Sequence, residues 1–175
     1  MDKLIILYGE QNAGKTSTLC KVFELLTGHT LAPADPQPDF RIVFPIGKKW
    51  VYMATYGDSQ GVIQTNFNFF SQKPHGKTNI YEFSGNTFIA IDKKRLQEIS
   101  PDVCITACRT YKASSPNDVY EKVNECILKC MPISDGIQWI AKFKGKGTRK
   151  RNKFFNTDHE TALKIVAEII KEPII

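Results

Sequence analysis

Residues 4–23 read Leu-Ile-Ile-Leu-Tyr-Gly-Glu-Gln-Asn-Ala-Gly-Lys-Thr-Ser-Thr-Leu-Cys-Lys-Val-Phe, and this stretch decides the fold. Its first five residues form a continuous apolar run, which is typical of a strand buried on both faces of a sheet. From Thr16 apolar residues recur three and four positions apart until Thr27-Gly28 ends the pattern, as expected for an amphipathic helix. The sequence therefore predicts a strand, a loop that contains two glycines, and a helix.

The loop between this strand and this helix matches the pattern G-x-x-x-x-G-K-[ST] in full. Its residues are Gly9, Glu10, Gln11, Asn12, Ala13, Gly14, Lys15 and Thr16, and Ser17 follows directly. Glycines let such a backbone curl so that its N–H groups converge on phosphate oxygens, and the N-terminus of the helix adds its positive dipole end. In this pattern the lysine reaches the β- and γ-phosphates and the threonine binds Mg²⁺. An ordinary glycine turn between a strand and a helix is the alternative.

Through this motif in its strand–helix context, the chain resembles the P-loop NTPase superfamily. The resemblance implies that residues 9–17 bind a nucleoside triphosphate with Mg²⁺, with Lys15 on the phosphates and Thr16 on the metal. ATP is expected rather than GTP, because the chain has no Asn/Thr-Lys-x-Asp motif to read guanine.

Strand and helix patterns also alternate along the rest of the chain. Extended segments are expected at 40–46, 50–56, 80–91, 103–108 and 137–143, and helices at 92–99, 115–131 and 157–170. Gly47-Lys48-Lys49 and Ser84-Gly85-Asn86 have the composition of hairpin turns. We predict one domain over residues 1–175, a three-layer α/β P-loop NTPase domain with a largely parallel sheet and an antiparallel hairpin at 40–56.

A carboxylate is expected beside Thr16 to hold Mg²⁺ or one of its water ligands. Asp58 is the preferred residue because it follows the extended segment 50–56, and Asp58-Ser59-Gln60-Gly61 resembles the D-x-x-G switch of GTPases. A polar turn after a strand is the alternative for this segment. Asp92, which follows the segment 80–91, is the rival metal-binding residue.

Arg109 stands directly after the predicted strand 103–108. Because the carboxyl ends of parallel strands open onto one edge of a sheet, Gly9, Asp58, Arg109 and Lys144 are expected to meet there. An arginine at that edge can neutralise charge that develops on a transferred phosphoryl group, although it can equally form a local ion pair. Lys15, Asp58 and Arg109 are therefore the predicted catalytic residues.

The net charge of +6 comes from one segment. The chain has 24 Lys and Arg against 18 Asp and Glu, and six of the basic residues lie in the decapeptide Lys144–Lys153. Without it the chain has 18 residues of each sign, so the basicity indicates one local anion site and not a nucleic-acid surface. Three interpretations of this decapeptide remain open. It contacts nucleotide phosphates or a phosphorylated substrate, it is a solvated charged face, or it binds nucleic acid.

Five cysteines without framework spacing favour reduced core thiols in a cytoplasmic protein over disulfides or a zinc site. Neither a signal peptide nor a membrane-spanning apolar stretch is expected. Three function classes remain: an Mg²⁺-dependent NTPase, a small-molecule or nucleotide kinase whose acceptor docks at 28–39, and a non-catalytic switch that binds a protein partner through 62–87.

Overall fold

The computed structural model describes residues 2–9, 13–31, 41–55, 80–109, 137–142 and 157–171. In chain order its elements are β1 (Lys3–Gly9), α1 (Lys15–Thr27), β2 (Arg41–Ile46), β3 (Lys49–Ala54), β4 (Ile80–Ser84), β5 (Thr87–Ile91), α3 (Lys93–Ile99), β6 (Val103–Arg109), β7 (Ile137–Ala141) and α5 (Asp158–Ile170). Each lies where the sequence predicts a strand or a helix. The helix expected at 115–131 lies outside the described residues.

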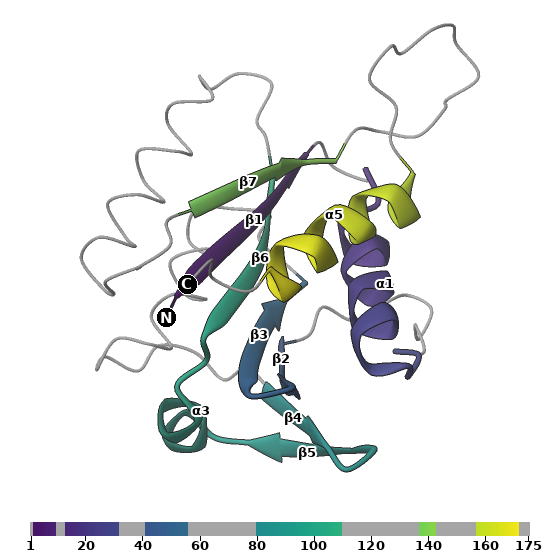
Figure 1. Cartoon of the computed structure of the whole chain (residues 1–175). Helices are drawn as coiled ribbons and strands as arrows, with labels where there is room; N and C mark the ends of the chain where they lie inside the picture. The colour runs from purple at the N-terminus through teal and green to yellow at the C-terminus, as the bar shows by residue number, and fades with distance from the viewer. Residues whose placement is uncertain are drawn as a thin grey trace, which may run out of the picture.

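The seven described strands form one sheet in the order β5-β4-β2-β3-β6-β1-β7. Helices α1 and α5 lie side by side on one face of this sheet, and α3 lies on the other (Figure 1). β1 pairs in parallel with both β6 and β7, and β6 pairs in parallel with β3. The strand that leads into the Gly9–Thr16 loop is therefore surrounded by parallel neighbours.

The prediction of a three-layer P-loop NTPase domain with a largely parallel sheet is wrong. The sheet is mixed, because β2–β3 and β4–β5 are antiparallel pairs. In each pair the strands are separated by only two residues, whereas a parallel connection needs a dozen or more. The second turn, Gly85-Asn86, has φ values of 59° and 65°, which suit a tight hairpin. The expected hairpin at 40–56 is confirmed by the β2–β3 pair.

The ends of the two long helices are set by their own sequences. Gly14 precedes α1 with φ 92°, and Gly28 closes it with its N–H on the carbonyl of Glu24. A capping box begins α5, since Thr157 and Glu160 each accept a hydrogen bond from the other's backbone N–H. These hydrogen bonds hold the pKa of Glu160 below its usual value.

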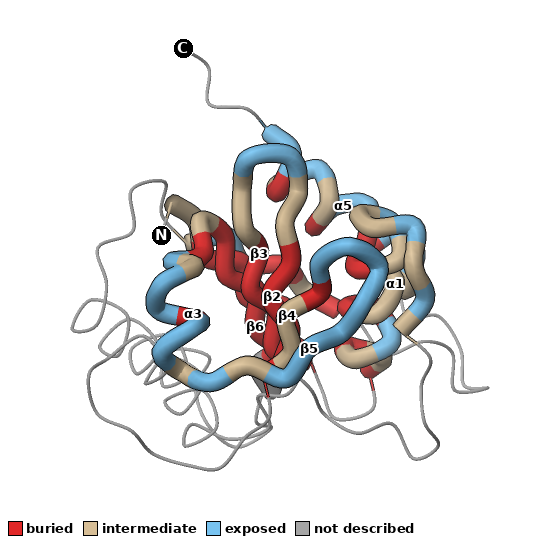
Figure 2. The backbone as a smooth tube through the Cα atoms, turned by 90° about the horizontal axis from the view of Figure 1, so that it is seen from below, coloured by how far each residue is buried: buried red, intermediate tan, exposed pale blue. Residues whose placement is uncertain are grey.

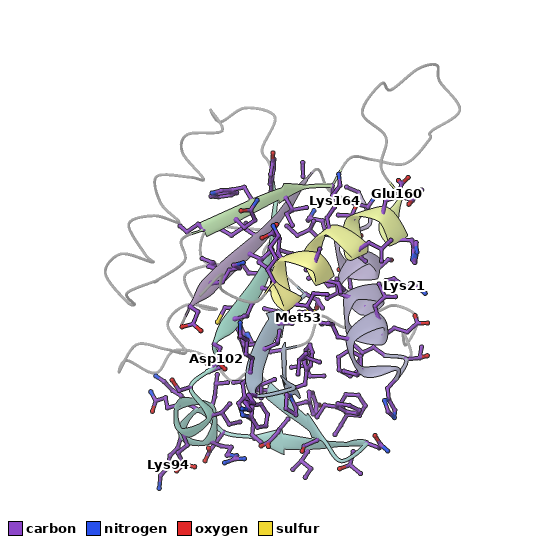
Figure 3. The ribbon with its side chains drawn as sticks, viewed as in Figure 1. Lys21, Met53, Lys94, Asp102, Glu160 and Lys164 are labelled. Carbon is purple, nitrogen blue, oxygen red and sulfur yellow. The ribbon has the colours of Figure 1, made fainter. Side chains whose placement is uncertain are left out.

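Alternate residues of the central strands build a core on each face of the sheet. On the face of α1 and α5, Phe23 and Ile165 pack with strand residues such as Met53, which is labelled in Figure 3. On the opposite face Leu96 of α3 belongs to one buried cluster with strand residues such as Ile6. Figure 2 shows the buried central strands and the exposed outer strand β5. No helix in the described part of the chain is long and apolar enough to cross a membrane.

Candidate nucleotide-binding site

The Gly9–Thr16 loop begins at the end of β1 and ends at the N-terminus of α1. Gly14, the N-cap residue, has the left-handed backbone that glycine adopts without strain. The next side chain, Lys15, is only 8% exposed, and its ammonium donates a hydrogen bond of 3.1 Å to the carbonyl of Gly9. Lys15 therefore folds back across the loop toward the end of β1.

Thr16 connects the start of α1 with the end of β3. Its hydroxyl donates to the carbonyl of Thr55, 3.4 Å away, and Thr55 directly follows β3. This contact places Thr16 beside the strand from which the chain continues to Asp58. Asp58 is three positions after Thr55, and a fully extended chain limits the distance between their Cα atoms to about 11 Å.

The strand ends predicted to share one edge do so wherever the structure describes them. Gly9 is paired with Arg109 across β1 and β6, and Tyr8 is paired with Ala141 across β1 and β7. Lys142 continues this alignment, because its N–H donates to the carbonyl of Tyr8 at 2.8 Å. The backbone of Arg109 therefore lies next to the loop, whereas its side chain is outside the described residues.

An ion pair lies against the loop from the side of β7 and α5. The ammonium of Lys142 is 3.1 Å from Oδ1 of Asp158, the first residue of α5. The same oxygen is 3.4 Å from the Thr18 hydroxyl, which itself donates to the carbonyl of Gly14 at 2.8 Å. A Cβ on Gly14 would lie only 2.7 Å from this carboxylate oxygen. The pair thus joins the end of β7, the start of α5 and the N-cap of α1.

This pair also fixes the two ends of the span that contains the basic decapeptide Lys144–Lys153. Lys142 precedes the span and lies beside Gly9, and Asp158 follows it and lies beside Gly14. The described residues on both sides of this span therefore lie next to the Gly9–Thr16 loop. The decapeptide itself lies outside the described residues.

The rival metal-binding residue Asp92 is not at this site. It follows β5, which is five strands from β1 in the sheet, or about 24 Å at the usual strand spacing. Its carboxylate accepts the N–H of Arg95 at 2.8 Å and caps α3. The interpretation of Asp92 as a metal-binding residue is therefore wrong, and its role is to begin a helix.

The structure describes only some of the other predicted site residues. Ala13 is buried and Ser17 is exposed at the start of α1, whereas Glu10, Gln11, Asn12 and Asp58 lie outside the described residues. Cys104 is 2% exposed, and burial raises the pKa of its thiol, as expected for a core cysteine. Among the described residues no group of three or more His, Cys, Asp or Glu is placed to hold a metal.

Sequence reasoning missed three residues at or near this edge: Lys142, Asp158 and Arg41. Arg41 is 1% exposed and begins β2 opposite Ala54 at the end of β3. The sequence places Lys142 inside the predicted strand 137–143, whereas β7 ends at Ala141, so Lys142 directly follows the strand. Asp158 is an ordinary first-turn carboxylate in the sequence, and no local pattern indicates that it contacts Gly14.

Replacement of Gly9 by alanine is expected to destabilise the fold and weaken ligand binding. A Cβ at this position would collide with the backbone carbonyl of Lys142, so β1 and the residue after β7 must separate. Such overpacking costs about 1–3 kcal/mol in the free energy of unfolding, which urea titration measures. Gly28→Ala is the control for affinity: its Cβ meets nothing within 4 Å, so at φ 73° it adds only local backbone strain, and its effect on ligand affinity should be nil. If Gly9→Ala and wild type bound the ligand with equal affinity, the close approach of the Lys142 carbonyl to Gly9 would not matter for ligand binding.

Comparisons of the chain with models of known protein families, with curated proteins and with solved structures gave no match.

Proposed function

We propose that the chain binds a nucleoside triphosphate, ATP in preference to GTP, at the Gly9–Thr16 loop, and that it transfers or hydrolyses the γ-phosphoryl group with Mg²⁺. The observation that carries this proposal is the position of Lys15. Its ammonium is almost fully withdrawn from water and lies across the loop on the carbonyl of Gly9. The contact with Gly9 holds the positive charge of Lys15 at the loop for which the motif predicts phosphate binding.

The backbone around the loop supports the same ligand. The N-terminus of α1 begins at Lys15, and helix N-termini attract anions through their N–H groups and their dipole. No carboxylate in the first turn of α1 competes with such an anion. Arg109 is paired with Gly9 across β1 and β6. We propose that its side chain neutralises the charge that develops on the transferred phosphoryl group.

The residues around Thr16 fit a magnesium ion. Hydroxyl and carboxylate oxygens are the ligands that Mg²⁺ prefers, and the Thr16 hydroxyl lies at the end of β3, from which the chain leads to Asp58. Thr16 and Asp58 would hold the ion, which neutralises charge on the phosphate oxygens. The proposal assigns Asp58 this role because Asp92 is far across the sheet and caps α3.

Asp58→Asn tests the metal assignment. The substitution is expected to weaken triphosphate binding in Mg²⁺ by about 10- to 100-fold, as for other changes next to a bound metal. Affinity measured in EDTA should change little, because the carboxylate acts through the metal. Asp92→Asn is the matched control and should leave both affinities unchanged. If Asp58→Asn had the same effect in Mg²⁺ and in EDTA, Asp58 would be a turn residue.

One observation favours a kinase as the second candidate function. α1 carries the chain about 20 Å from the loop over its 13 residues. β2 nevertheless starts at the edge of the site, because Arg41 pairs with Ala54. The chain is therefore back at the edge of the site at Arg41, next to which an acceptor could dock. Rapid phosphate release from ATP without any acceptor would favour the hydrolase, and release that depends on an added acceptor would favour the kinase.

A further inference from the structure

The buried cation Lys142 lies beside the Gly9–Thr16 loop but outside the motif. Its side chain is 2% exposed, whereas the side chain of its partner Asp158 is 46% exposed. The backbone of Lys142 is tied to the end of β1 through Tyr8 and abuts Gly9. Any ligand held by the loop therefore experiences the charges of this pair.

The carboxylate of Asp158 lies at the positive end of α1. Its Oδ1 is close to both Gly14 and the Thr18 hydroxyl. A carboxylate at a helix N-terminus interacts favourably with the same positive end that attracts a phosphate. Asp158 is thus placed to compete with an anionic ligand, and Lys142 is placed to offset that competition.

We propose that the Lys142–Asp158 ion pair sets the affinity of the Gly9–Thr16 loop for the phosphate chain, with Asp158 and Lys142 acting as positioning residues of opposite sign. This inference rests on the proposed function. Asp158 lowers the positive potential at the start of α1 and holds the ammonium of Lys142. Lys142 neutralises the carboxylate and keeps the loop attractive to phosphate.

The opposite charges of the two residues give a sharp test. MgATP is titrated calorimetrically into wild type, Asp158→Asn, Lys142→Met and the double variant. Asp158→Asn should bind about three- to tenfold more tightly, because one negative charge near the phosphates is lost. Lys142→Met should bind about tenfold more weakly, because the carboxylate is then uncompensated. The affinity of the double variant for MgATP should lie within about twofold of that of wild type.

A matched control removes the same charge from the same helix. Glu168 of α5 pairs with Lys3 at 3.4 Å, and ten residues of helix place it about 15 Å from Asp158. Glu168→Gln should leave the affinity for MgATP unchanged, although the net charge changes as it does in Asp158→Asn. At about 1 M salt, where the Debye length is about 3 Å, the differences between the variants should shrink. A purely structural effect of the substitutions would persist.

Weaker binding by both single variants, or unchanged binding by Asp158→Asn, would overturn the role of the pair and leave the proposed function intact. Urea unfolding of each variant shows whether a loss of affinity reflects a loss of folded protein. The half-exposed Asp158 keeps the test valid even if Lys142→Met unfolds. Failure of the wild type to bind MgATP would overturn both this inference and the proposed function.

Discussion

Lys15→Ala is expected to weaken MgATP binding by about 10- to 150-fold for each charge-assisted hydrogen bond to phosphate that is lost. The substitution would remove the ammonium that lies 3.1 Å from the carbonyl of Gly9. Each charge-assisted hydrogen bond to a phosphate contributes about 1.5–3 kcal/mol, and about 1.4 kcal/mol corresponds to a tenfold change in affinity. Calorimetric titration of the two proteins with MgATP measures the difference.

The fold should survive this substitution, because Lys15 belongs to neither of the two apolar core clusters. Lys15→Met keeps most of the volume of the side chain and separates loss of charge from loss of packing. Lys21→Ala is the matched control: it removes a lysine of the same helix that is labelled in Figure 3, and its ammonium pairs with Glu24 at 3.2 Å. Loss of affinity in Lys21→Ala as large as that in Lys15→Ala would mean that only the overall charge matters.

Phe23→Ala is expected to reduce the free energy of unfolding by about 3–5 kcal/mol, as deletion of a buried aromatic ring usually does. Phe23 is fully buried in α1, and its ring lies 5.1 Å from that of Phe44, 5.0 Å from that of Phe83 and 5.9 Å from that of Phe88. These rings join α1 to β2 and to the β4–β5 hairpin. For a chain of this length the melting temperature should fall by roughly 6–20 °C.

A neighbouring residue of the same helix gives the control for this prediction. Leu25 is 39% exposed, so Leu25→Ala should cost much less than Phe23→Ala in urea unfolding. Phe23→Leu should recover part of the loss, because it fills part of the cavity. If Phe23→Ala and Leu25→Ala had equal effects, the aromatic cluster would not hold α1 on the sheet.

The elements of this fold could be predicted from local signals in the sequence. The capping box at Thr157 and Glu160 determines where α5 starts, and Gly28 determines where α1 ends. Both hairpins were identified from turn residues only a few positions apart. Such signals act within one turn of helix or one turn of chain, so they can be read without knowledge of the rest of the molecule.

The order and direction of the strands could not be read in the same way. β1, β3 and β6 are each apolar along most of their length, so any of them fits a central place in a sheet. The alternation of strands and helices favoured parallel pairing, but the short turns of the two hairpins impose antiparallel pairs locally. In this chain the two-residue turns therefore decide the direction of the strands that they join, and the alternation of strands and helices does not.

Contacts between residues distant in sequence account for what was missed at the site. The Asp158 carboxylate meets Gly14 across 144 positions of the chain, and the Thr16 hydroxyl meets the Thr55 carbonyl across 39. Only the packing of α5 against α1 and the pairing of β3 with β6 bring these groups together. The motif predicted the loop itself, whereas the charges beside it depend on the folded sheet.

Amide hydrogen exchange with and without MgATP tests the central proposal most directly, because it reports where the nucleotide binds. Exchange should slow most in peptides that cover residues 9–16, since their N–H groups would donate to phosphate oxygens. The same peptides of Lys15→Ala should show much weaker protection at the same nucleotide concentration. Unchanged exchange over residues 9–16 in the wild type, or protection confined to residues 144–153, would contradict triphosphate binding at this loop.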